Sequence, residues 1–511
     1  MPHVSRQDGT PEQAANAGRV PMSLIVRAAM AIGLMIGFYL LALGIASVLA
    51  YIPYAQWTYT NHLTVQLAVF CVASAVGILW SVLPRFERFV APGPRLEAHA
   101  QPQLFQAVRG IAAATGQEMP SEIYLVPDLN AWVRDRGGIL GLGSRRVMGL
   151  GLPLLQLLTV HQFQAVLAHE FGHYFRGDTK LGPWIYKTRG AIARTLQRLH
   201  GSILQKPFVL YGELFLQITL AVSRRQEFAA DGLAAQVVGP APLIEGLKSM
   251  HAVAPAFDRY WQGEVVPVLS HGYRPPIADG FTRFVAASSV ASMVHEHLEQ
   301  QLAESQAAPY DTHPALRERI AALQSLPAIN ASPDDRRATC LLADIDALEV
   351  ELLGSLGPRV TDFKTLAWED IGETVYLPIW KQASIQYAAA FEELKPEVFP
   401  RCAEKMDVYA ERFPLQQNAA DPIPEEKRRW AMYLTGAALA TVLVKRGWHV
   451  RVPLGESVVV AHDGVEVKPF EIMTTLISGS MSAENWLATC DRAGIRELDL
   501  GAELLREVVA T

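Results

Sequence analysis

The feature that most limits how this chain can fold is a run of about 24 residues, Ala28 to Tyr51, without a charged side chain. A helix of that length is long enough to cross the hydrocarbon core of a bilayer. A second apolar run, His62 to Leu83, follows and ends at Pro84. We therefore predict a flexible tail over residues 1–22 and a two-helix transmembrane hairpin over residues 23–90.

A secretory signal peptide is the rival explanation of the first run, because Arg27 precedes it. The run is too long for an ordinary signal-peptide core, and a second apolar run follows, so an uncleaved anchor is favoured. The whole chain is 50% hydrophobic and only 19% charged, which also points to membrane segments. A lipid bilayer is thus an expected partner.

Positive charge flanks this hairpin on both outer sides and is missing between the two runs. By the positive-inside rule, both termini are then cytoplasmic. The charges are Arg6, Arg19 and Arg27 before the hairpin and Arg85, Arg88 and Arg95 after it. The net charge of −6 gives no reason to expect nucleic acid as a partner.

The strongest chemical signal is an H-E-x-x-H motif, His169-Glu170-Phe171-Gly172-His173. On a helix, residues four apart share a face, so the two imidazoles can meet at one point and bind a metal ion such as Zn²⁺. Glu170 lies next to the first ligand and can act as a general base. A capping box of Thr159 and Gln162 predicts the start of this helix.

The motif leaves a third metal ligand to be found. The segment Ser223 to Asp231 has the small residues of a closely packed helix, and Glu227 is the candidate ligand. Asp231, one turn later, can accept the free N–H of a ligating histidine and so orient its ring.

Several segments together resemble the HtpX and CAAX-prenyl-protease family of integral-membrane zinc metallopeptidases. The resemblance covers roughly residues 95–325. It implies a gluzincin in which His169, His173 and Glu227 bind one zinc ion, Glu170 is the catalytic base and peptide bonds are hydrolysed. The matching segments are Asn130-Ala-Trp, Gly151-Leu-Pro-Leu-Leu, Ala165-Val-Leu-Ala-His-Glu-Phe-Gly-His, Ser223-Arg-Arg-Gln-Glu-Phe-Ala-Ala-Asp and Thr312-His-Pro.

The resemblance leaves the role of His313 open. It could approach the metal in a resting state, help to stabilise the oxyanion, or simply begin a helix before Pro314. Some relatives have two further spans between the metal motifs. Here Pro207 to Val222 is short for a span and carries Glu213, so we predict a buried or interfacial helix that runs into the Glu227 helix.

Two strands are predicted near the metal helix, Glu122 to Val126 and Arg145 to Leu150. In zincin-type sites a strand beside this helix pairs with the extended substrate backbone. We expect residues 145–150 to be that strand, with Arg145, Val147 and Gly149 as its substrate residues. Such pairing recognises the substrate backbone rather than its side chains, and therefore predicts that substrates of many sequences are accepted.

The remaining chain suggests an accessory module. A linker-like stretch near Asn330 separates a zincin-like α+β domain, 95–328, from an α+β domain over residues 338–511. The latter contains an apolar stretch, Trp430 to Val444, expected to be a core helix, and a hairpin turning at Asp463-Gly464. It shows no second catalytic constellation, and a substrate-presenting or partner-binding role is a hypothesis.

The whole chain is thus expected to be mainly α with a small β-sheet. The leading function is a membrane-anchored zinc endopeptidase that cleaves proteins or peptides on the cytoplasmic face of a bacterial-type inner (plasma) membrane, in membrane-protein or protein quality control. The alternative is a non-proteolytic membrane scaffold whose structural metal site is closed by a fourth ligand, for which His313 is the candidate. The oligomeric state stays open.

Overall fold

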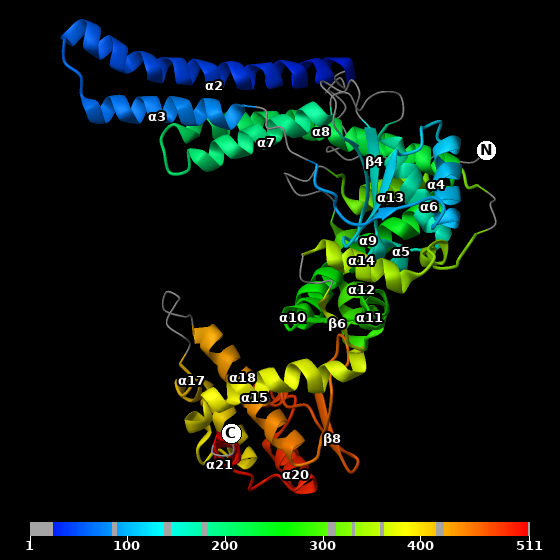
Figure 1. The fold of residues 1–511 in the computed structure, drawn as a ribbon, viewed down its shortest axis with the longest axis vertical. Coiled ribbons are helices and arrows are strands. Elements are labelled where there is room, and N and C mark those ends of the chain that lie inside the picture. The colour runs from blue at the N-terminus through cyan, green and yellow to red at the C-terminus, as the bar shows by residue number, and fades with distance from the viewer. Residues whose placement is uncertain are drawn as a thin grey trace, which may run out of the picture.

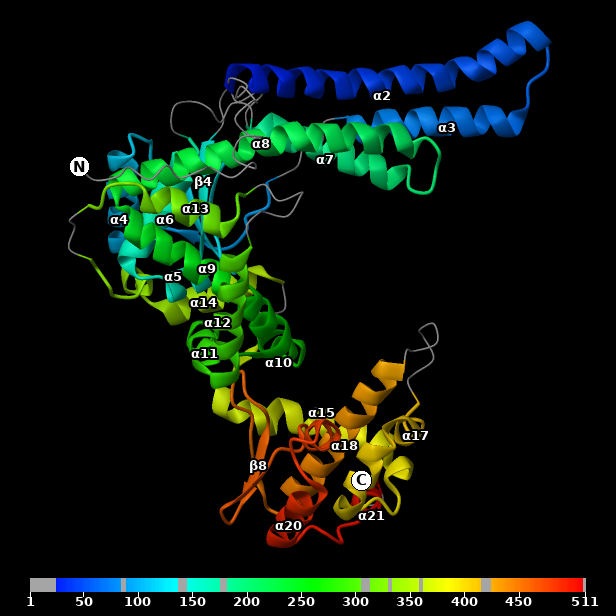
Figure 2. The ribbon, with the colours of Figure 1, turned by 180° about the vertical axis from the view of Figure 1, so that it is seen from behind.

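A computed structural model of the chain describes residues 24–83, 89–136, 145–174, 182–304, 313–329, 333–357, 362–414 and 424–508. Within these ranges the chain is mainly helical and carries three small sheets (Figure 1). This confirms the expected fold class in its coarse form. The ribbon divides into a bundle of long helices, a mixed α+β part and a C-terminal part, as the reverse view also shows (Figure 2).

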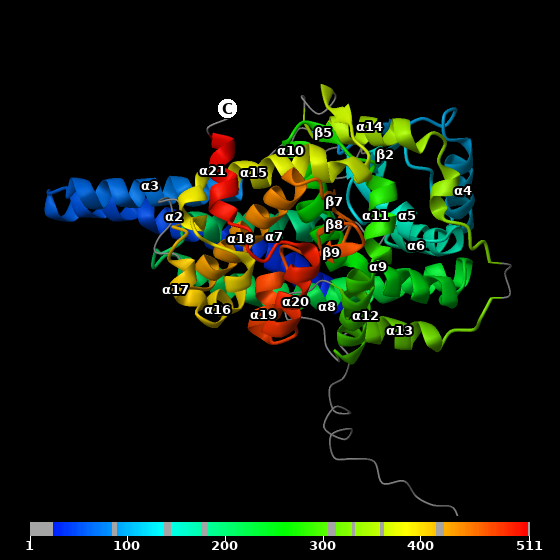
Figure 3. The same cartoon turned by 90° about the horizontal axis from the view of Figure 1, so that it is seen from below.

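The bundle is built on the two apolar segments, α2 (Leu24–Thr60) and α3 (Val65–Val82). They lie antiparallel and extend beyond the rest of the molecule (Figure 3). Both are long and apolar enough to cross a membrane, and only 28% of the apolar window of each is buried. The core helix of a soluble protein would be mostly buried, so this low burial favours an apolar environment around the pair.

Two further helices, α7 (Gly182–Arg198) and α8 (Gln205–Val237), pack along one end of this pair. The ring of Phe38 in α2 meets the ring of Phe208 edge-on at 6.2 Å, and the Tyr211 hydroxyl donates to the Leu34 carbonyl. The prediction that residues 207–222 lead directly into the Glu227 helix is confirmed, because α8 is one helix of 33 residues.

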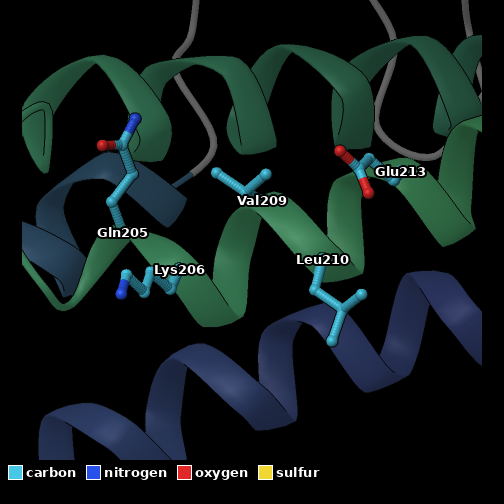
Figure 4. A pocket seen from close by; sticks show the side chains of 5 residues that line it. All are labelled: Gln205, Lys206, Val209, Leu210 and Glu213. Atoms are coloured by element: carbon cyan, nitrogen blue, oxygen red, sulfur yellow. The ribbon is translucent and has the colours of Figure 1, made fainter.

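A shallow hollow lies on the N-terminal half of α8, where Leu210 points toward the neighbouring helix α2, drawn in dark blue (Figure 4). Glu213, at its far end, precedes Glu227 by 14 positions, or about 21 Å along the helix. The hollow is therefore separate from the histidine motif. Its lining residues are Gln205, Lys206, Val209, Leu210 and Glu213.

The mixed part contains a four-stranded sheet of order β1-β2-β4-β3. Strands β2 and β4 are parallel, whereas β3 runs antiparallel to β4. The strand β3 was not predicted, because its second half, Arg134-Asp-Arg, lacks the apolar alternation of a half-buried strand. The strands are β1 (Arg95–Leu96), β2 (Glu122–Val126), β3 (Ala131–Arg136) and β4 (Arg145–Gly151).

The prediction that residues 145–150 pair with a substrate backbone is wrong. Strand β4 is interior, since β2 occupies one of its edges and β3 the other. The side chains of Arg145 and Val147 also project from the face away from the main core, where Val147 packs with Tyr124 and Val126. On the same face Gly149, which has no side chain, lies under the Trp132 ring. Among the described strands, β3 presents the open edge on this side.

The main core joins the other face of this sheet to the surrounding helices. Its buried residues run from Leu96 to Leu323 and continue through Leu341, Leu352 and Val375. The helices are α4 (Pro102–Ala114), α5 (Leu152–Leu157), α6 (Val160–Gly172), α9 (Pro240–Tyr260), α10 (Val266–Ser270), α11 (Ile277–Ala286), α12 (Ser288–Ala303), α13 (Leu316–Gln324) and α14 (Ile345–Ser355). A two-stranded sheet pairs β5 (Tyr273–Arg274) with β6 (Lys364–Thr365).

A second core, from Trp380 to Leu504, holds the C-terminal part together. The predicted core helix is confirmed within α18 (Pro424–Lys445), and the hairpin turns at Asp463 and Gly464, both with positive φ. The domain limits proposed at residues 328 and 338 stay a prediction. The remaining elements are α15 (Leu377–Gln386), α16 (Phe399–Glu404), α17 (Met406–Ala410), β7 (His449–Arg451), β8 (Val459–His462), β9 (Val465–Val467), α19 (Ile472–Ser478), α20 (Ala483–Ala493) and α21 (Leu500–Val508).

One buried carboxyl group links two helices of the main core. Glu349 in α14 is only 6% exposed and accepts the backbone N–H of Ala278, in the first turn of α11, at 2.6 Å. Burial raises the pKa of Glu349 to about 7, which outweighs the opposite effect of that backbone hydrogen bond.

This buried carboxyl predicts a pH-dependent stability. Between pH 4.5 and 7 the folded state holds a proton on Glu349 that the unfolded state has lost, so the free energy of unfolding falls as the pH rises. The Glu349→Gln variant should match wild type near pH 5 and exceed it by up to about 3 kcal/mol at pH 8. Urea unfolding followed by tryptophan fluorescence measures this difference.

The exposed Glu351 on the same helix provides the matched control. The Glu351→Gln variant should keep the wild-type pH dependence. Equal pH dependence in wild type and Glu349→Gln would show that the buried carboxyl is not the cause.

Candidate functional site

The histidine motif lies on α6, and its sequence explains where that helix begins. Thr159 Oγ1 accepts the Gln162 N–H at 3.2 Å, and Gln162 Oε1 accepts the Thr159 N–H at 3.0 Å. The predicted capping box is therefore confirmed. Buried apolar residues, among them Phe163 and Phe171, fix the helix against the main core.

Helix α8 crosses α6 very closely at the end of the motif. A Cβ atom added to Gly172 would lie 2.8 Å from Ala230 Cα, so only glycine fits at this crossing. The close approach sets Glu227, one turn before Ala230, against both motif histidines. Residues 223–237 thus reach the site as part of the same helix that begins in the bundle.

The spacing of the donor atoms fits a tetrahedral metal ion. His169 Nε2 lies 3.5 Å from Glu227 Oε2, and His173 Nε2 lies 3.5 Å from Glu227 Oε1. Two ligands on a tetrahedral zinc ion, each bound at 2.0–2.1 Å, are separated by about 3.4 Å. The Glu170 carboxylate is also close, because donor atoms of His169, Glu170 and His173 all lie within 4.8 Å of one another.

The Glu227 carboxylate also has one oxygen without a hydrogen-bond partner, which a bound cation would stabilise. Its Oε2 atom is buried and has no hydrogen-bond partner among the described residues. An ionised oxygen buried without a partner is costly, whereas a bound divalent cation offsets that cost. The set of two imidazoles and one carboxylate could therefore hold a metal ion.

A second layer of charge supports these groups. Asp231 Oδ1 lies 2.9 Å from His169 Nδ1, the ring nitrogen that faces away from Glu227. Arg319 in α13 donates two hydrogen bonds to the Asp231 carboxylate in a bidentate arrangement, from Nε to Oδ2 at 2.8 Å and from Nη2 to Oδ1 at 2.6 Å. Its Nη1 atom is 3.8 Å from Glu227 Oε2. Arg319 thus orients the aspartate that fixes the His169 ring.

Arg319 was missed by sequence reasoning, although a signal was present. It is 4% exposed and falls on the same helix face as Leu316, Ile320 and Leu323, which are all buried. A charged residue in the apolar stripe of an amphipathic helix needs a buried partner of opposite charge.

The protonation preferences of the site follow from this network. Although burial opposes ionisation of Glu227 and Asp231, hydrogen bonds and neighbouring positive charge lower the pKa of both, that of Glu227 to about 2. Burial lowers the pKa of His173 to about 4, and burial raises the pKa of Glu170 to about 7. Burial also opposes charge on His169, but the carboxylates of Asp231 and Glu227 beside its ring raise its pKa to about 9.

His313 also reaches the site from a different part of the chain. Its Nε2 atom lies 3.7 Å from Glu227 Oε1, and its side chain is 53% exposed. The residue before it in the predicted Thr-His-Pro element, Thr312, lies outside the described residues. The predicted residues His169, Glu170, His173, Glu227, Asp231 and His313 are therefore brought together, whereas Arg145, Val147 and Gly149 face elsewhere.

Comparison with known proteins places this site in a family. Residues 98–326 match peptidase family M48. The protease HtpX of Idiomarina loihiensis is 26% identical over 214 residues, which cover 37% of this chain and 72% of that protein. The protease HtpX of Xanthomonas axonopodis pv. citri is 24% identical over 243 residues, or 43% of this chain and 71% of that protein.

A protease HtpX homolog of Nitrosomonas europaea is 27% identical over 167 residues, which cover 29% of this chain and 55% of that protein. No solved structure shows a significant match. The matched segment contains the H-E-x-x-H motif, Glu227 and the Arg319 helix. Residues 98–326 of the chain therefore match peptidase family M48 and are similar to HtpX proteases, which supports a metallopeptidase assignment for this region.

Proposed function

We propose that this chain is a membrane-anchored zinc endopeptidase that hydrolyses peptide bonds at the cytoplasmic face of a membrane. The observation that carries the proposal is the 3.5 Å spacing of the Glu227 carboxylate from each motif histidine. His169, His173 and Glu227 would hold the metal. Zinc is the ion of choice because it accepts imidazole and carboxylate together in tetrahedral geometry.

The chemistry is divided between the bound ion and the side chains around it. When bound, zinc acts as a Lewis acid and makes water easier to deprotonate. Glu170 takes the proton of the attacking water and returns it to the leaving amine. His313, close to Glu227 and half exposed, donates to the oxygen that becomes negative in the tetrahedral intermediate.

The substrate backbone lies along β3, the open edge of the sheet beside α6. An extended peptide added antiparallel to this edge gains main-chain hydrogen bonds, which favours unfolded or extended segments of any sequence. The proposed hairpin over residues 23–90, which contains α2 and α3, anchors the enzyme in an inner-membrane-type bilayer, with residues 95–328 as the peptidase domain. Together these features suit membrane-protein or protein quality control, with residues 338–511 presenting substrate.

Replacement of the proposed base should abolish cleavage. The Glu170→Gln variant keeps the shape of the side chain but cannot accept the proton, and general-base catalysis contributes about 10²–10⁴-fold. Hydrolysis of casein by the purified full chain should fall at least about 100-fold while zinc stays near one per chain. The control is Glu245→Gln, at an exposed position on α9. If wild type shows no cleavage that Glu170→Gln removes, a scaffold with a structural metal site is favoured instead.

Replacement of the aspartate behind His169 should weaken metal binding. The Asp231→Asn variant removes the charge that orients the imidazole and that Arg319 holds, and loss of such a partner costs about 10–100-fold in metal affinity. Competition with a chromogenic chelator measures this affinity. The exposed Asp279→Asn change serves as control. Unaltered affinity in Asp231→Asn would refute the orienting role.

Replacement of His313 distinguishes its two proposed positions. As an oxyanion donor, its loss in His313→Ala should lower kcat about 10²–10³-fold with zinc content unchanged. A histidine that instead holds the metal in a resting state would give a variant with equal or higher activity and lower metal affinity. Steady-state kinetics and metal analysis of the same preparation separate these results.

A further inference from the structure

Helix α7 and the first turn of α8 carry an excess of positive charge. Between Asp178 and Glu213 the sequence has six lysines and arginines and no acidic residue. The sequences of the other two helices of the bundle, α2 and α3, contain no acidic residue either. Glu213 lies seven positions, or about 10 Å, beyond Lys206 on α8, and the two occupy opposite ends of the hollow in Figure 4. The opposite charge that this segment requires is therefore not supplied by the bundle.

The cations of α7 lie along one stripe of the helix. Lys187, Arg194 and Arg198 follow one another at intervals of seven and four positions, so they share one side. Lys187 and Arg198 are exposed, and Arg194 is partly exposed. The stripe borders the packed face of α7 and is open to the surroundings of the bundle. The packed face is buried in the core of the bundle through Ile185, Ala191, Ile192 and Leu199.

Two contacts fix this stripe beside the end of α3. Thr195 Oγ1 and Ser81 Oγ share a hydrogen bond of 2.8 Å, and both residues are fully buried. Arg194 Nε donates to the Ser81 carbonyl at 3.3 Å. Ser81 is the last residue but one of α3, and a cation is a favourable partner for the carbonyl groups that a helix C-terminus leaves free. Arg194 is therefore held at the C-terminal end of α3.

In the proposed membrane anchor, this end of α3 lies at the edge of the hydrocarbon. The helix has 18 residues and is about 27 Å long, which is barely enough to cross a hydrocarbon core of about 30 Å. Trp80, at the same end, is 57% exposed, and exposed tryptophan is favoured at the level of the lipid headgroups. The bond between Arg194 and Ser81 therefore places the stripe at headgroup level.

We propose that Lys187, Arg194, Arg198 and Lys206, the basic patch, bind the phosphate groups of anionic phospholipids. Arg198 ends α7 and Lys206 is the second residue of α8, so both flank the connection between the two helices, and both are exposed. Arginine and lysine bind phosphate through charge-assisted hydrogen bonds. Ile203, in this connection, is 76% exposed and suits contact with acyl chains. This inference rests on the proposed membrane anchoring and adds the class of lipid that contacts the bundle.

The test compares lipid binding by the purified full chain in micelles of a neutral detergent. Native mass spectrometry counts the bound lipids during titration with phosphatidylglycerol or with phosphatidylcholine of the same acyl chains. Wild type should bind phosphatidylglycerol more tightly. The double variant Arg198→Gln/Lys206→Gln should bind it about 25-fold more weakly, because each cation near an anionic lipid surface contributes about fivefold. Its binding of phosphatidylcholine should stay unchanged, which a general loss of folding would not produce.

The matched control is Arg109→Gln/Arg401→Gln, which removes two exposed cations on α4 and α16 and should bind both lipids as wild type does. Equal phosphatidylglycerol binding in wild type and Arg198→Gln/Lys206→Gln overturns the inference. Loss of the wild-type preference on addition of inorganic phosphate alone, at constant ionic strength, also overturns it, because the patch would then be a site for free anions. A full chain that alkaline carbonate extracts from membranes overturns the proposed anchoring itself. A chain that stays in the membrane but shows no lipid preference overturns only this inference.

Discussion

The site depends on two carboxylates that α8 carries one turn apart in a place nearly closed to water. Glu227 is 7% exposed and Asp231 is 2% exposed, so two negative charges are buried within a few ångströms of each other. Such charges are stable only with opposite charge and hydrogen bonds on every side. His169 and His173 come from α6, and Arg319 comes from α13. Among the described residues the buried Glu227 Oε2 atom still has no hydrogen-bond partner, and a divalent cation would supply the missing positive charge. Three segments distant in sequence are thus held together by one electrostatic requirement.

Helix α8, which carries both carboxylates, also connects the site to the apolar helix bundle. Helix α8 is 33 residues long, or about 50 Å, and no glycine or proline interrupts it between Glu213 and Glu227. Its first half packs against α2 and α7, and its second half carries the site carboxylates. A displacement of the bundle therefore moves Glu227 directly, because no flexible joint lies between them. The orientation of the site relative to the candidate membrane helices is set by a single rigid element.

Sequence reasoning identified the parts of the site whose chemistry follows local spacing. The histidines four apart, the capping box and the Glu227–Asp231 turn all depend on helix periodicity, and the structure brings these side chains together. Arg319 could not be assigned a partner from sequence, because its contact with Asp231 joins residues 88 positions apart. The wrong prediction that β4 pairs with substrate has a similar origin. Strand β3 occupies the edge of β4, and the charged second half of β3 gave no strand pattern in the sequence. The order of strands in a sheet also depends on pairings between distant segments, which local sequence patterns do not show.

The domain boundary near residue 330 was also predicted from a local sequence pattern, the linker-like composition. The structure shows that residues after this linker pack into the same core as residues before it. Residues from Ala338 to Val375 contribute to the main core, and Leu454 joins the same core. Next to it, Gly455 has a φ of +70° and lies against Val290 so closely that a Cβ atom would be 2.7 Å from it.

Glu456 completes this contact by accepting the Ser288 N–H at 2.8 Å and the Ser288 hydroxyl at 2.9 Å, at the first turn of α12. A carboxylate at a helix N-terminus satisfies free amide groups and is favoured by the helix dipole. Helix α12 ends at Ala303, ten positions before His313. The C-terminal part therefore caps the helix that precedes the most exposed histidine of the site, and its removal would leave that helix without its cap.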